Sequence, residues 1–307
     1  MRNPKKIPIA TPKATPRRLN LHSCGFFKAG PIHFISLFCS HHYSQTISSS
    51  TALSSKNRIK TNAVLVIGTH LSDTEDNIHE MNKIADFFSL RGVRVHKFYL
   101  QNSKWEDIKQ AAKNAHFFVY NGHGSNKGKN GTGGLVLADY VTNDQIENEL
   151  ELRSNAMVLF QSVCRAAGSS AGDNGDIGVQ KAEQRVSDYA EPFIKNGASV
   201  YYANNYHEGC LEFLNYFFLG NTIEESYKKS LVGSLNIEFI KAYSYNPKYN
   251  VSISSSQPYG TVTYTHTSWV NGVKTTTTEE IPDSKSYSTA FVGKSNFKFI
   301  NLKNLTQ

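Results

Sequence analysis

The sequence has few cysteines and no long apolar run. Only four of its 307 residues are cysteine: Cys24, Cys39, Cys164 and Cys210. Four cysteines are too few for a disulfide scaffold in a chain of this length. No stretch of 18 or more residues is continuously apolar. We therefore expect no integral membrane segment.

Acidic side chains are missing from the start of the chain. The formal net charge is +8, and much of that excess lies within residues 1–18, which hold basic residues and no Asp or Glu. No basic run interleaved with aromatic residues follows in the rest of the chain. Such a run is the usual mark of a nucleic-acid surface, so we expect no nucleic-acid partner.

The composition is otherwise that of a globular protein. Hydrophobic residues make up 39% of the chain and charged residues 19%. The 16 Tyr and 18 Phe are too many for a mainly disordered chain. The length allows one large domain or two modest ones with a sizeable core.

Residues 1–61 differ in character from the rest. Prolines and basic residues come first, an apolar patch follows at Pro31–Cys39, and a Ser/Thr run occupies Ser44–Ser55. These are the parts of a secretory signal, which would place the protein in a secreted or periplasmic space. The alternative is a disordered leader on a cytoplasmic protein. The His and Cys residues here match no metal-ligand spacing, so we predict neither a metal nor a cofactor.

Residues 62–235 alternate between short apolar runs and amphipathic helical patterns. The expected strands are Ala63–Ile67, Val93–Leu100, His116–Tyr120, Ala156–Phe160 and Ala198–Tyr202. Capping boxes predict three helix starts, at Ser72/Glu75, Ser103/Glu106 and Thr142/Gln145. Continuous apolar strands that alternate with helices predict a mostly parallel sheet covered by helices on both faces.

Residues 236–307 form a β-rich C-terminal segment in this interpretation. The segment is rich in Thr, Ser and Tyr, and Asn271-Gly272 lies between two alternating runs, Thr261–Val270 and Val273–Ile281. Asn-Gly is a strong signal for a two-residue hairpin turn. The segment is either a module of its own or an extension of the first sheet.

Two reactive residues follow two of the buried runs. His123 comes shortly after His116–Tyr120, and Cys164 comes shortly after Ala156–Phe160. Functional groups in open α/β sheets gather beyond the carboxyl ends of the strands. If the two strands are neighbours about 4.8 Å apart, His123 and Cys164 meet at one edge of the sheet.

This pair suits nucleophilic catalysis. A thiol with a pKa near 8.5 is mostly protonated at neutral pH, and an imidazole that takes its proton produces the nucleophilic thiolate. The backbone N–H groups of Gly124 and Cys164 are candidate donors to a developing oxyanion.

Simpler interpretations compete with this one. A Cys after a strand is usually a small buried apolar residue, and a His in a Gly-rich turn is usually solvated. Elsewhere, His207 and Cys210 are too few for a metal site. The Gly- and Lys-rich Asn126–Gly134 lacks the Walker spacing.

The order of these motifs resembles the clan CD cysteine peptidases, which include caspases and gingipains. The likeness is nearest to gingipains and to the caspase-like CHAT domains, over roughly Asn62–Leu231 and most evidently over Gly134–Cys164. It implies a caspase-like three-layer sandwich, a catalytic pair of His123 and Cys164, and Gly124 as an oxyanion donor. The caspase motif Q-A-C-R-G is not matched, because Gln161 lies three positions before the Cys and Ala166 replaces the Gly.

The function expected from this resemblance is a cysteine endopeptidase that forms a thioester and acts on a protein or peptide substrate. Asp173 and Asp176 follow the nucleophile closely and could select basic residues, whereas Arg165 could favour an acidic group. The alternative for both Asp residues is helix capping or exposure to water. Two other functions remain open: a catalytically silent interaction module, and a different thiol hydrolase or transferase.

Overall fold

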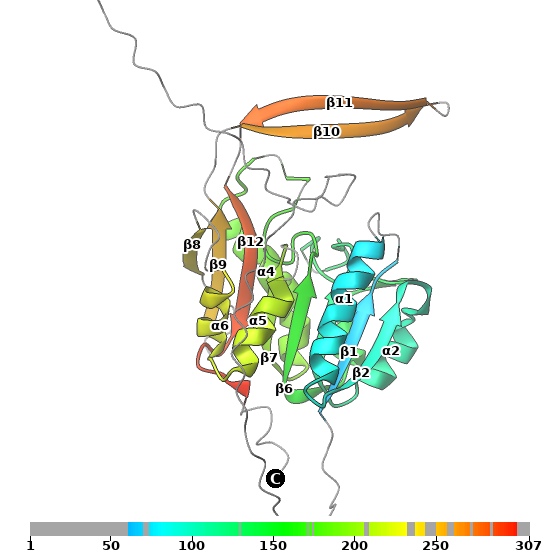
Figure 1. Ribbon diagram of the computed structural model, residues 1–307, viewed down its shortest axis with the longest axis vertical. Helices are drawn as coiled ribbons and strands as arrows, with labels where there is room; N and C mark the ends of the chain where they lie inside the picture. Colours follow the sequence, from blue (N-terminus) through cyan, green and yellow to red (C-terminus); the bar gives the residue numbers. More distant parts are fainter. Residues whose placement is uncertain are drawn as a thin grey trace, which may run out of the picture.

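The computed structural model describes residues 61–69, 74–128, 130–170, 172–173, 175–205, 209–231, 237–242, 250–256, 261–270, 273–282 and 285–299. Eight strands form its main sheet, in the order β2-β1-β3-β6-β7-β12-β9-β8 (Figure 1). Their bounds are β2 (Arg94–Tyr99), β1 (Asn62–Ile67), β3 (Ala115–Asn121), β6 (Leu152–Gln161), β7 (Ala198–Asn204), β12 (Ser286–Gly293), β9 (Asn250–Ser256) and β8 (Ile237–Ala242). The first five in spatial order pair in parallel, and the last three add antiparallel strands.

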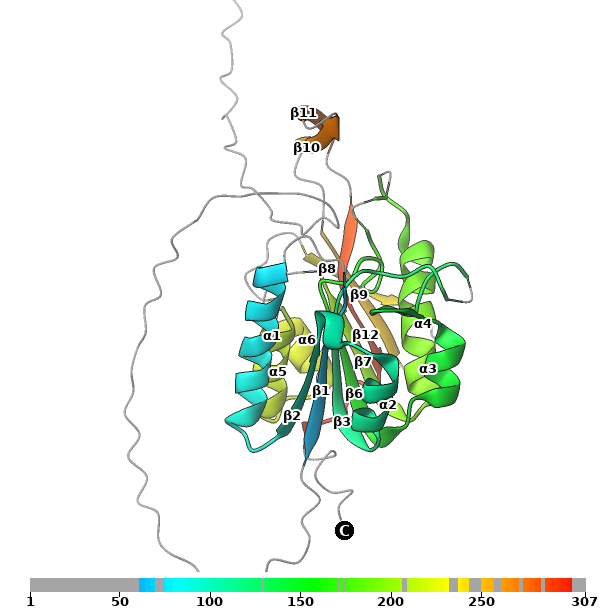
Figure 2. The ribbon, with the colours of Figure 1, turned by 90° about the vertical axis from the view of Figure 1, so that its right-hand side faces the viewer.

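Helices cover both faces of the sheet, as Figure 2 shows. One face carries α1 (Thr74–Ser89), α5 (Gly209–Phe218) and α6 (Ile223–Lys229); the other carries α2 (Trp105–Ala112), α3 (Asn143–Glu149) and α4 (Val179–Lys195). The apolar side chains accordingly form two clusters, one on each side of the sheet.

Strand β3 shows why the apolar runs are continuous. All of its residues are buried, with Phe117 and Val119 in the cluster beside α1 and α5, and Phe118 and Tyr120 in the cluster beside α2 and α4. A strand between two helix layers must be apolar on both sides. This confirms the prediction of an α/β fold with a mostly parallel sheet flanked by helices.

The predicted capping boxes have different outcomes. The box of Thr142 and Gln145 is confirmed at the start of α3. The box of Ser103 and Glu106 is wrong. Residues Leu100–Asn102 form a short 3-10 turn, the Ser103 hydroxyl bonds to the Leu100 carbonyl, and α2 starts after Lys104 without a side-chain cap. Ser72 lies outside the described residues.

The C-terminal strands extend the first sheet. Strand β12 pairs antiparallel with β7, β9 pairs with β12, and β8 pairs with β9. Strands β10 (Thr261–Val270) and β11 (Val273–Pro282) form a separate antiparallel ribbon. Of the two alternatives for residues 236–307, extension of the sheet therefore holds for β8, β9 and β12. Asn271, Gly272 and the leader up to residue 60 lie outside the described residues.

Within the described ranges, none of the helices has both the length and the apolar character needed to cross a bilayer.

Candidate active site

The strands that precede His123 and Cys164 are neighbours. β3 and β6 pair in parallel, with Tyr120 opposite Phe160 and Asn121 opposite Gln161 at their carboxyl ends. His123 follows the end of β3 and Cys164 follows the end of β6, so both loops start from adjacent points on one edge of the sheet. Both residues are half-buried.

The two loops touch backbone to backbone at Gly124. A methyl group at this position would lie 2.1 Å from the carbonyl oxygen of Cys164 and 3.0 Å from the hydroxyl of Tyr189. Neither contact leaves room for a side chain. Glycine therefore lets the loop that carries His123 pack directly against the loop that carries Cys164.

The hydroxyl of Tyr189, on α4, links the same two loops. It accepts a 2.7 Å hydrogen bond from the Ser125 N–H, and it lies 3.3 Å and 3.4 Å from the carbonyl oxygens of Ser125 and Cys164, to which it can donate. Burial raises the pKa of Tyr189 far above its ordinary value, so the hydroxyl keeps its proton. This residue was missed in the sequence, because a Tyr at helical spacing among apolar residues looks like ordinary core.

The Tyr120 hydroxyl forms hydrogen bonds with the backbone of the turn that carries His123. Its hydroxyl donates to the carbonyl of His123 at 3.1 Å or of Val136 at 3.2 Å, and accepts from the Val136 N–H at 3.0 Å. A methyl group at Gly122 would lie 2.3 Å from this hydroxyl. The turn is thus closed tightly over the tyrosine oxygen, which fixes the backbone on both sides of His123.

The backbone around Cys164 is strained. Ser162 has φ of 55° and Arg165 has φ of 70°, in the left-handed region that non-glycine residues rarely occupy. Residues of this kind cost about 1–3 kcal/mol each and gather at active sites, where surrounding structure enforces them. Two such residues so close to Cys164 distinguish this loop from an ordinary strand-to-helix connection.

Buried polar groups hold the ends of the strands beside this loop. Gln161, the last residue of β6, donates to the Glu80 carboxylate at 3.2 Å and accepts from Asn204 at 3.2 Å. It also accepts from the backbone N–H of Cys210 at 3.0 Å. This network crosses from α1 to β7 and α5, and it ties the end of β6 to these three elements beside the candidate site.

The two cysteines in the described domain differ in environment. Burial raises the pKa of the Cys210 thiol well above its ordinary value, so Cys210 is an inert core residue. The sulfur of Cys164 takes part in a disulfide. The thiol chemistry considered below therefore belongs to the reduced protein.

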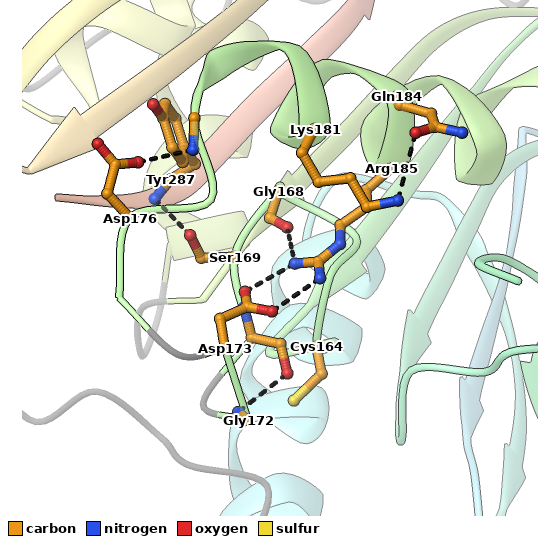
Figure 3. A network of polar contacts seen from close by, with 12 residues as sticks. Cys164, Gly168, Ser169, Gly172, Asp173, Asp176, Lys181, Gln184, Arg185 and Tyr287 are labelled. Carbon is orange, nitrogen blue, oxygen red and sulfur yellow. Dashed lines mark hydrogen bonds and ion pairs between the residues drawn. The ribbon is translucent and has the colours of Figure 1, made fainter. Parts of the chain in front are cut away.

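The two candidate pocket residues have local partners. Both carboxylate oxygens of Asp173 accept from the Arg185 guanidinium, at 2.6 Å and 2.7 Å, and Asp173 also accepts from the Ser170 N–H (Figure 3). Arg185 donates in addition to the Gly168 carbonyl at 3.0 Å. Asp176 is exposed and accepts from the Gly178 N–H. The charge of Asp173 is balanced where it lies, and its pair with Arg185 anchors the loop that follows Cys164.

The other predicted residues are placed as follows. Gly124 is half-buried and forms an antiparallel bridge with Leu135, which lies later in the same loop. His207 lies outside the described residues. Among those that are described, no three His, Cys, Asp or Glu residues gather where they could hold a metal ion.

Tyr189→Phe tests the link between the loops. The change leaves the buried Ser125 N–H without its acceptor, which is expected to lower the free energy of unfolding by about 1–3 kcal/mol. Urea unfolding measures this. Tyr140→Phe is the matched control, because Tyr140 is 59% exposed and its loss should cost less than about 0.5 kcal/mol. Equal stability of the two variants would mean that the Tyr189 hydroxyl does not hold the loops together.

The chain matches no protein-family model, and no curated protein is similar to it at a significant level.

Proposed function

We propose that this chain is a caspase-like cysteine endopeptidase in which Cys164 is the nucleophile and His123 its base. One observation carries the proposal: the parallel neighbours β3 and β6 end in two loops that touch at Gly124 and Cys164. The resemblance to clan CD peptidases and the strained backbone around Cys164 support it.

The reaction proceeds in two stages. His123 takes the proton of the Cys164 thiol, and the sulfur attacks the carbonyl carbon of a peptide bond. Backbone N–H groups of Gly124 and Cys164 receive the oxyanion, the C–N bond breaks, and the amine leaves with the proton from His123. Water then attacks the thioester, the C–S bond breaks, and the thiol is restored.

A preference for basic residues remains a prediction. It rests mainly on Asp176, which is exposed, because the Asp173 carboxylate is already paired with Arg185. A peptide library that varies the residue before the cleaved bond would measure it. Asp176→Asn should weaken any preference for Lys or Arg, and a preference for Asp would contradict the prediction.

Labelling of the reduced protein with a thiol-directed peptide probe tests the proposed function. We expect the label on Cys164, faster than on a free cysteine at pH of about 6–8, near the unperturbed His and Cys pKa values. Cys210→Ala should label like the parent, and Cys164→Ala should lose the fast label and react no faster than free cysteine.

A reduced parent in which Cys164 reacts no faster than free cysteine would favour the silent interaction module instead. Labelling without peptide cleavage would favour a different thiol hydrolase or transferase.

A further inference from the structure

The β10–β11 ribbon is inserted at the edge of the sheet that carries the candidate site. β12 runs antiparallel to β7, so its first residues lie beyond the carboxyl end of β7, with Thr289 opposite Asn204. β9 ends there too, because Ser256 pairs with Ser286. The chain between Ser256 and Ser286 therefore leaves and re-enters the sheet at the edge from which the loops of His123 and Cys164 also start (Figure 1).

The ribbon is a two-stranded sheet of its own. Its strands pair in ten consecutive positions, from Thr261 opposite Pro282 to Val270 opposite Val273. At about 3.3 Å per residue, strands of this length extend roughly 33 Å. In the described part of the chain no further strand pairs with either one. An isolated two-stranded ribbon is marginally stable in water, and its unpaired N–H and C=O groups are a template for another strand.

The start of β12, the strand that follows the ribbon, is tied to the loop of Cys164. The Ser169 N–H donates to the Tyr287 carbonyl at 2.9 Å, and the Tyr287 N–H donates to the Ser169 hydroxyl at 2.8 Å (Figure 3). The Arg165 N–H donates in turn to the Ser169 carbonyl at 2.9 Å. A methyl group at Gly168 would lie 2.7 Å from the Tyr287 Cβ, so the loop and the strand pack closely. The strand that follows the ribbon is thereby held against the loop that carries Cys164.

We infer that the β10–β11 ribbon is a docking strand for an extended segment of a polypeptide substrate, which pairs along one edge by strand addition. The inference rests on the proposed function for its substrate class. An unfolded segment of a peptidase substrate offers an extended backbone that can pair with the unpaired N–H and C=O groups along the ribbon. A second copy of the chain is the competing occupant, and the experiment below separates the two.

The sheet register allows a clean deletion of the ribbon. Ser256 and Ser286 are direct antiparallel partners, so an Asn-Gly turn in place of residues 257–285 should close β9 onto β12. A half-length ribbon keeps the base intact: Tyr264 and Glu279 are partners, and Asn-Gly in place of residues 265–278 joins them. If the full deletion disturbs the sheet, this second variant still tests the ribbon, because it leaves the junction with β9 and β12 unchanged.

The first readout is binding of casein, an unfolded protein, by full-length chains carrying Cys164→Ser, which needs no catalysis. We expect the ribbonless chain to bind casein at least about tenfold more weakly, or about 1.4 kcal/mol, with the half-length ribbon in between. Casein affinity that is equal in all three chains would overturn the inference, as would a dimer of the parent that the deletion dissociates without weakening casein binding.

The second readout uses chains with an intact Cys164. We expect the ribbonless chain to lose kcat/KM for casein at least about tenfold, while a short peptide is cleaved within about twofold of the parent rate and the probe labels Cys164 normally. If the parent neither labels nor cleaves but the deletion still weakens casein binding, the proposed peptidase activity fails and the docking ribbon stands.

Discussion

The reduced Cys164→Ala variant is expected to cleave no peptide bond at all, because alanine cannot form the thioester. His123→Ala is expected to lower kcat/KM about 10²–10⁴-fold, the usual contribution of a general base. Both side chains are half-buried in loops beyond the sheet, so neither change removes a core contact. Turnover of a fluorogenic peptide by the reduced protein measures both effects, and thermal unfolding shows whether the fold persists.

Matched controls separate catalysis from structure. Cys210→Ala and His79→Ala should retain parental turnover, since Cys210 lies on the buried side of α5 and His79 is exposed on α1. Added imidazole should partly restore His123→Ala, which a purely structural role for the histidine would not produce. A folded Cys164→Ala variant that cleaves peptide like the parent would refute the cysteine-peptidase proposal.

Arg185→Met is expected to lower the free energy of unfolding by about 3–5 kcal/mol, because it leaves the Asp173 carboxylate buried without its compensating charge. The two side chains are only 10% and 11% exposed, and two short hydrogen bonds join them. Loss of the Arg185 bond to the Gly168 carbonyl adds to the cost. Urea unfolding at neutral pH measures the change.

Lys195→Met is the control on the same helix. Its ion pairs with Glu147 and Glu191 are solvated, with Lys195 46% exposed, and such pairs contribute about 0–1 kcal/mol. The double variant Arg185→Met/Asp173→Leu should recover part of the loss, because it removes both buried charges. If Arg185→Met is no less stable than Lys195→Met, the pair does not anchor the loop after Cys164.

Local sequence was a good guide to the parallel strands. Phe117–Tyr120 and Met157–Phe160 are apolar at every position, and only a strand between two helix layers needs that. Local sequence was a poorer guide to helix starts. Ser103 and Glu106 fit a capping box, yet the Ser103 hydroxyl bonds instead to Leu100, because the preceding residues turn as a 3-10 helix. A cap is decided by the conformation of the residues around it as well as by their identity.

By itself, the sequence determined the α/β class and the strands β3 and β6, and it proposed His123 and Cys164, which follow them, as candidate reactive residues. Those features depend on short-range periodicity and on one residue at a time. Only the tertiary structure decided that Tyr189 joins the two loops, that Asp173 is paired with Arg185, and that Tyr287 of β12 bonds to Ser169. Each of these is a bond whose partner the sequence leaves open. Either the two residues are far apart along the chain, or several nearby residues could serve as the partner, and only the packing of the folded chain selects one.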